Sequence, residues 1–423
     1  MGALDQKAKV YYLRIPRRAV ALLLAAMLLP WAVVLFVTMR PEKAAVAQAS
    51  PAPALSAAEV LKARTHVKPG PWGTLEYVDI KTQPPDEFIS PNLFGGSHPR
   101  WVFKGFSKSA VEELFAACGL NEAQHKSLSA AIALDAAKNE CVVTPDDEVL
   151  FGLASDARAR VYSVLAKSPE NSAQRDPFIF KKDMIGPHLD ASGLNADTIT
   201  QIKKLLYPSG DLVLLADIGT IARRVTDVQE RSRLFRTLLQ RVSMFLRLRL
   251  APDSDIKALT DYWGRGGRAT AVAPLLESLQ NASSPISVDV TLLLPTFART
   301  RLYTYPFPSS KSEAAAQDCH WSALNFFNET VDDRFTKPDV VRSTIEKEYY
   351  PVPGSPAFGD LALLSTPEGA IVHSAVFIAD DVFFTKNGAS YISPWLLVTQ
   401  HELMDSFPAY EKLQMVFYRM KKL

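Results

Sequence analysis

The pattern of apolar and polar positions divides the chain into successive stretches. Residues 19–39 carry no charge and are apolar on every face, which predicts a helix long enough to cross a bilayer at about 1.5 Å per residue. Residues 40–70 are rich in Ala and Pro and indicate a linker. Helical spacing predominates over 71–285, and short β-rich runs follow over 286–423. We therefore expect an α+β protein with an N-terminal transmembrane helix, an α-helical middle domain and a C-terminal α+β domain.

Charges flank the apolar segment unequally. Lys and Arg are frequent in residues 1–18 and sparse just after residue 39. The positive-inside rule then predicts a cytoplasmic tail over 1–18 and a single-pass protein of the inner membrane whose remaining domains are periplasmic. The alternative is a cleaved signal peptide, because Ala47-Gln48-Ala49 has the small-x-small form of a cleavage site.

Capping residues mark the clearest helices of the middle stretch. Ser107 precedes an apolar run that Gly119 ends, and Ser155 opens a run that reaches Leu165. The spacing also predicts helices over 211–225 and 229–250.

Eight arginines lie between Arg223 and Arg249, interleaved with Leu, Phe and Met. They suggest either a surface for anionic polymers or lipid headgroups, or the solvated face of a long amphipathic helix. The chain as a whole has 47 Lys+Arg against 45 Asp+Glu, and this near-neutrality favours the solvated helix face. The same balance argues against a nucleic-acid partner.

Three cysteines set the limits of the thiol chemistry. Cys118 and Cys141 flank a predicted helix, so they either form a disulfide or remain separate buried thiols. Cys319 stands apart from them, after a polar loop and at the start of an apolar pattern of helical spacing. A cysteine in the first turn of a helix is favoured as thiolate, and the free N–H groups there can receive the oxyanion of an acyl-transfer intermediate.

A thiol nucleophile needs a base, and His373 opens the apolar run SAVFIA downstream of Cys319. A third polar group should orient the imidazole. The following run, from Asp381 to Gly388, is predicted to be the hairpin partner of this strand. It offers Asn387 and, as the competing candidate, Thr385.

The order of these residues resembles the NlpC/P60 family and the related CHAP amidases, papain-like cysteine peptidases and amidases of bacterial cell walls. The resemblance rests on Asp318-Cys319, on the turn PAFGD that ends at Asp360, and on a histidine that opens the next strand. It covers only roughly the last 120 residues, within the predicted C-terminal α+β domain of residues 286–423. It implies that Cys319 is the nucleophile, His373 the base and Asn387 the orienting residue.

The same resemblance implies hydrolysis of an amide or peptide bond through a thioester, with peptidoglycan or another envelope peptide as substrate and no cofactor. The sequence departs from the family pattern at His320-Trp321, where the family usually has Ser-Gly. Two other functions stay open: an inactive binding module with the same fold, and a structural protein of the cell envelope.

One further motif is set aside. His401-Glu402 begins like a zinc-binding helix, but Asp405 stands where the second histidine is required. We expect a plain helix there and no metal site.

Overall fold

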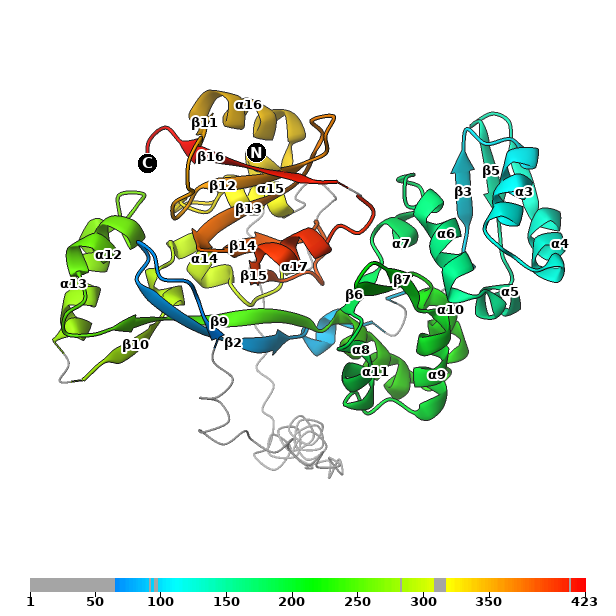
Figure 1. Cartoon of the computed structure of the whole chain (residues 1–423), viewed down its shortest axis with the longest axis horizontal. Helices are drawn as coiled ribbons and strands as arrows, with labels where there is room; N and C mark the ends of the chain where they lie inside the picture. The colour runs from blue at the N-terminus through cyan, green and yellow to red at the C-terminus, as the bar shows by residue number, and fades with distance from the viewer. Residues whose placement is uncertain (1–64, 91–92, 95–97, 282–283, 308–316, 411) are drawn as a thin grey trace, which may run out of the picture. The chain divides into compact units, whose positions relative to one another are not determined.

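The computed structural model describes residues 65–423 except 91–92, 95–97, 282–283, 308–316 and 411 (Figure 1). The described residues belong to one compact unit. The predicted cytoplasmic tail, the predicted transmembrane helix, the signal-peptide site and most of the linker lie outside the described residues.

The membrane prediction requires a correction. Across the part of the chain that the structure describes, no helix combines the length and the apolar character needed to cross a bilayer. Residues 19–39, to which the prediction was assigned, are not among those described. The transmembrane helix and the single-pass inner-membrane location are therefore withdrawn.

The described residues form four antiparallel sheets (Figure 1). The first contains β1 (Thr65–His66), β2 (Thr74–Thr82), β9 (Arg241–Leu250) and β10 (Ile286–Asp289). The second sheet has the order β3 (Trp101–Lys104), β5 (Glu140–Val143) and β4 (Ile132–Asp135). The third sheet has the order β6 (Phe178–Lys181), β8 (Leu212–Leu215) and β7 (Tyr207–Ser209). The largest has the order β11 (Tyr349–Pro351), β16 (Gln414–Met420), β12 (Leu361–Ser365), β13 (Ile371–Ala379), β14 (Val382–Lys386) and β15 (Trp395–Thr399).

Helices lie both before and after residue 286 in the chain. The earlier helices are α3 (Lys108–Ala117), α4 (Glu122–Ala130), α5 (Asp147–Gly152), α6 (Ser155–Leu165), α7 (Ser172–Arg175), α8 (Ile185–Asp190), α9 (Ala196–Leu205), α10 (Ile218–Arg224), α11 (Val228–Leu239), α12 (Ile256–Trp263) and α13 (Ala269–Gln280). The later helices are α14 (Thr296–Arg301), α15 (Cys319–Leu324), α16 (Pro338–Glu348) and α17 (Gln400–Asp405), and the 3-10 turns are η1 (Asp86–Phe88), η2 (Val290–Leu293) and η4 (Asp333–Thr336).

The middle stretch is not α-helical throughout, so that part of the predicted fold class is wrong. The helix caps at Ser107 and the helix from Ser155 are confirmed as α3 and α6. The helix predicted over 229–250 instead divides into α11 and the ten-residue strand β9. The alternation of Val, Met and Leu after residue 241 is a period of two, which is typical of a strand. The arginines of this segment therefore lie on two helices and a strand, and the long amphipathic helix is wrong.

One hydrophobic core extends across the predicted boundary at residue 286. It includes Leu246 and Leu248 of β9, Trp321 of α15 and Val376 of β13. A polar contact reinforces it, because Ser243 Oγ donates to the Leu397 carbonyl at 2.9 Å and accepts from the Leu397 N–H at 3.0 Å. Strand β9 is thus packed as part of the C-terminal structure.

The six-stranded sheet buries both of its faces. On one face, Val376, Ile378 and Phe384 pack with residues of α15 in the core just described. On the other, Phe377 and Phe383 pack with residues of α17 in a separate cluster. Because side chains alternate along a strand, each residue of β13 faces either α15 or α17.

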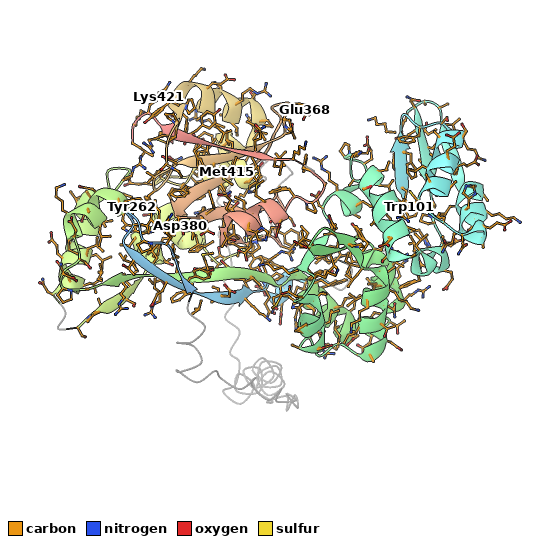
Figure 2. The ribbon with its side chains drawn as sticks, viewed as in Figure 1. Trp101, Tyr262, Glu368, Asp380, Met415 and Lys421 are labelled. Carbon is orange, nitrogen blue, oxygen red and sulfur yellow. The ribbon has the colours of Figure 1, made fainter. Side chains whose placement is uncertain are left out.

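Helix α12 is joined to the same sheet at the end of β13. The Tyr262 hydroxyl donates to the Ile378 carbonyl at 2.7 Å. Asp380, labelled in Figure 2, follows β13, and its carboxylate accepts from the Lys68 N–H at 3.2 Å. These bonds position the turn between β13 and β14 against the first sheet.

Cys118 and Cys141 are both free and buried in one core cluster. Cys141 Sγ donates to the Phe106 carbonyl at 3.2 Å. Burial raises the pKa of both thiols. Of the two alternatives that the spacing allowed, the structure shows separate thiols.

Candidate active site

Cys319 is the first residue of α15, as the sequence predicts. Asp318 precedes the helix as its N-cap, and its carboxylate accepts from the Trp321 N–H at 2.8 Å. This cap explains why the chain turns into a helix at this position. The Cys319 side chain is 6% exposed, so the predicted nucleophile is buried.

His373 lies on β13, but its side chain faces away from α15. The next residue, Ser374, has its hydroxyl hydrogen-bonded to His320 Nδ1 on α15, at 2.7 Å. Successive side chains of a strand point to opposite faces, so the His373 ring lies on the α17 side of the sheet. There its Nε2 is hydrogen-bonded to Thr385 Oγ1 at 2.7 Å, and its ring centroid lies 4.9 Å from that of Phe407. Within the described residues, no hydrogen bond joins Cys319 to His373.

The protonation states also disfavour a thiolate–imidazolium pair. Burial, with a smaller contribution from the Asp318 carboxylate, raises the pKa of Cys319 to about 12. Burial, with a smaller contribution from His320, lowers the pKa of His373 to about 3. Near neutral pH the sulfur is therefore a thiol and the imidazole is uncharged. The N–H groups of this six-residue helix do not outweigh the desolvation of the sulfur.

The two candidates for the third residue have different surroundings. Thr385 is the residue that bonds to His373, and it is buried within β14. Asn387 follows β14, is exposed, and makes no hydrogen bond to His373 among the described residues. The orienting contact that the sequence assigned by preference to Asn387 is made by the competing candidate, Thr385.

Lys386 is a buried charge that the sequence did not single out. Its side chain is fully buried, and its Nζ donates to the Gly388 carbonyl at 2.6 Å and to the Ser390 carbonyl at 3.0 Å. Burial lowers its pKa to about 8, although Cys319 and Asp318 act in the opposite direction. Lys386 therefore lies on the α15 side of the sheet, and its two hydrogen bonds stabilise the loop after β14.

The turn before β12 is held by close packing and by a buried ion pair. Gly359 has φ 86°, and a Cβ at this position would overlap the Phe327 ring. Asp360 is fully buried and accepts from Arg419 Nε at 2.8 Å and Nη2 at 2.7 Å. The Phe377 N–H donates to the Asp360 carbonyl at 2.9 Å, so the turn is tied to β13 and holds the position of that strand.

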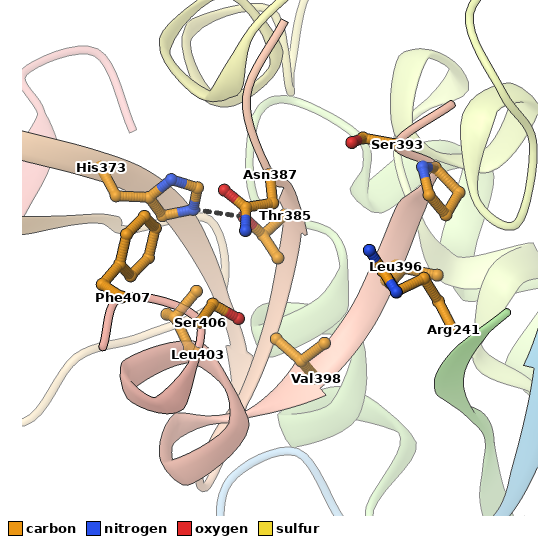
Figure 3. A pocket seen from close by; sticks show the side chains of 11 residues that line it. Arg241, His373, Thr385, Asn387, Ser393, Leu396, Val398, Leu403, Ser406 and Phe407 are labelled. Atoms are coloured by element: carbon orange, nitrogen blue, oxygen red, sulfur yellow. Dashed lines mark hydrogen bonds between the residues drawn. The ribbon is translucent and has the colours of Figure 1, made fainter. Parts of the chain in front are cut away.

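A cavity of about 100 Å³ lies on the α17 side of the sheet (Figure 3). Its polar lining consists of Arg241, His373, Thr385, Asn387, Ser393 and Ser406. Figure 3 shows His373 and Phe407 at one end and Arg241 at the other. The cavity thus brings together two of the predicted site residues, His373 and Asn387, and leaves out the third, Cys319.

Arg241 is the lining residue that the sequence assigned to the wrong element. The prediction placed it inside a helix, whereas it begins β9. The alternation from Val242 to Leu250 was the available signal, because it places Arg241 at the start of a strand rather than on a solvated helix face.

The histidine motif near the C-terminus lies on helix α17, so the helix expected there is confirmed. His401 and Asp405 of α17 lie one turn apart, with Nε2 to Oδ2 at 3.4 Å. In the described part of the chain, no group of three His, Cys, Asp or Glu side chains could hold a metal ion.

Comparisons with protein-family models, with curated proteins and with solved structures each found no match to this chain.

Proposed function

We propose that residues 286–423, together with the strands that complete their core, form an NlpC/P60-like module that binds its target without hydrolysing it. One observation supports this choice over the hydrolase: Ser374, and not His373, faces α15, which begins at Cys319. Hydrolysis of an amide by a cysteine nucleophile requires a base within reach of the thiol, and the same group must then protonate the leaving amine.

The packing of β13 opposes a rearrangement that would restore the pair. Turning His373 toward Cys319 requires a one-residue slip of the strand, which would exchange the two faces of every residue in it. Val376 and Ile378 would leave one core, and Phe377 would leave the other. The Asp360–Phe377 and Gly359–Phe377 backbone hydrogen bonds, both 2.9 Å, would also break.

The resemblance supplies the target class for this proposal. Family members act on peptidoglycan, so the peptide and amide groups of peptidoglycan, or of another envelope peptide, are the ligands to test first. The inactive binding module, one of the alternatives that the sequence left open, then replaces the hydrolase as the favoured function.

The test compares the release of peptidoglycan fragments with the binding of the protein to peptidoglycan. Purified peptidoglycan is incubated with the protein and with Cys319→Ser, and soluble fragments and co-sedimented protein are both measured. We expect no fragments from either protein and equal co-sedimentation, because Cys319 is a packing residue. Release of fragments by the wild type and not by Cys319→Ser would overturn the proposal in favour of a hydrolase.

A further inference from the structure

The cavity under α17 contains polar groups that the fold itself leaves without partners. Arg241 Nη1 donates to the Leu238 carbonyl at 3.1 Å and to the Gln240 carbonyl at 3.4 Å. Its Nη2 and Nε have no hydrogen-bond partner among the described residues, and no described carboxylate lies within 4.0 Å of it. The Asn387 amide and the Ser393 hydroxyl likewise have no side-chain hydrogen bond to a described residue. Arg241 is on β9, Asn387 directly follows β14, and Ser393 is in the loop before β15.

The charge of the lining is a single positive one. Arg241 is the only residue of the lining that is charged at neutral pH, since burial lowers the pKa of His373 to about 3. Lys386, the other cation of this region, is on the opposite face of the sheet with Cys319. One guanidinium without an acidic partner matches one monoanion, and the planar guanidinium suits a carboxylate best because it can donate two parallel hydrogen bonds.

The size of the cavity is consistent with such a group. Its volume of about 100 Å³ holds several water molecules, since each needs roughly 10–15 Å³ in this measure. Asn387 is exposed, so a longer ligand can leave the cavity beside it. Phe407 and Leu403 supply an apolar wall against which a short aliphatic part would pack (Figure 3).

We propose that this cavity binds the carboxylate of a monoanionic ligand, with Arg241 as its charge partner and Asn387 and Ser393 as further donors. The inference deepens the proposed function by naming the chemical group that is bound. The carboxylate has two sources, a small free acid or the terminus of a peptide.

The test is carboxylate-dependent binding by the full chain, measured by calorimetry and by the shift in Tm. The probes are acetate and N-acetylglycylglycine, compared with acetamide, N-acetylglycylglycinamide and chloride at equal ionic strength. We expect both carboxylates to bind and to raise Tm, while the amides and chloride do not. Tighter binding of the peptide identifies a chain terminus as the source, and tighter binding of acetate identifies a small acid; both results support the site.

Two variants and a control locate the binding. Arg241→Met should weaken carboxylate binding about 10-fold or more, because a charge-assisted hydrogen bond is lost. Asn387→Asp should do the same by repulsion, and at an exposed position it does not disturb the core. Arg247→Met, on the same strand but outside the lining, should bind as the wild type does. Equal stabilisation by the amides, or unchanged binding in both Arg241→Met and Asn387→Asp, would overturn the inference.

The two proposals fail separately. Acetate has no amide bond that the protein could hydrolyse, so its Arg241-dependent binding is measured independently of catalysis. Release of peptidoglycan fragments would end the non-hydrolytic proposal and leave the carboxylate site standing.

Discussion

His373 and Ser374 are neighbours on β13, yet each is hydrogen-bonded at 2.7 Å to a different layer of the structure: His373 to Thr385 of the sheet and Ser374 to His320 of α15. This arrangement is the reason why we favour a binding site over a catalytic one. Cys319 and His373, which the sequence predicts as nucleophile and base, lie on opposite sides of the sheet, because successive side chains of β13 point to opposite faces.

Acid should destabilise the protein partly through His373. Its pKa is about 3 in the folded protein and near 6.5 when exposed, so the unfolded chain binds the extra proton between these values. The folded state is therefore favoured above about pH 6.5, and this contribution is lost as pH falls toward 3, at up to about 1.4 kcal/mol per pH unit. His373→Gln should flatten the pH dependence of the free energy of unfolding, measured with urea.

The control for this experiment is His401→Gln, since the His401 side chain is 77% exposed. It keeps the buried imidazole of His373, so it should not flatten the pH dependence as His373→Gln does. A His373→Gln protein with the same slope as the wild type would show that the imidazole titrates normally in the fold.

The thiol of Cys319 should react slowly. Its side chain is 6% exposed and its pKa is raised to about 12, so thiolate is scarce near neutral pH. Iodoacetamide labelling, located by mass spectrometry, should leave Cys319 unmodified in the native protein and modify it after unfolding. Native labelling faster than that of a free cysteine, and lost in His373→Ala, would contradict the separation of the two residues.

Gly359 and Gly369 form a matched pair, because both have φ 86°. Alanine at Gly369 meets no atom within 4 Å and carries only the cost of a left-handed backbone, about 1–2 kcal/mol. Alanine at Gly359 also overlaps the Phe327 ring, which adds about 1–3 kcal/mol. Chemical denaturation should therefore rank Gly359→Ala as clearly less stable than Gly369→Ala, and equal losses would show that Phe327 moves aside freely.

Asp360→Asn should lower the free energy of unfolding by about 3–5 kcal/mol, the usual effect of removing one partner from a buried ion pair. Asp360 is fully buried and binds Arg419 through both oxygens, and Arg265 Nη1 lies 3.6 Å from Oδ1. Asp261→Asn is the control, because its pair with Lys257 is exposed and should add little. A loss as small as that of the control would mean that the turn does not depend on this carboxylate.

The sequence predicted the local structure wherever a capping residue was present, or wherever the spacing of apolar residues stayed the same along the segment. The helix expected at Cys319 is α15, Ser107 is the N-cap of α3, and the run that contains His373 is a strand. The direction of the His373 side chain was not predictable, because β13 is buried on both faces and shows no alternation of polar and apolar residues. Local patterns define an element, but the face that a side chain occupies depended here on which helices cover the sheet.

The choice between Thr385 and Asn387 failed for a related reason. The sequence places both on the strand after His373 or just beyond it, and it favours Asn387 because the return strand is expected to bring its amide near the ring. The strand ends at Lys386, so Asn387 leaves the sheet while Thr385 remains beside the ring. In α11 and β9 the error was one of period: arginines at varied spacing obscured the change from helical spacing to strict alternation.

The pairing of β2 with β9 has a consequence for how the chain can be divided. Thr82, the last residue of β2, is paired with Arg241, the first residue of β9, so residues 83–240 leave and re-enter the sheet at one point. Topologically, residues 83–240 are an insertion into a β-hairpin. All the buried residues of their two hydrophobic cores lie between Ile89 and Leu239. A short turn from Thr82 to Arg241 would close the hairpin, so the natural unit of the C-terminal fold is discontinuous in sequence: it starts before residue 83 and resumes at residue 241.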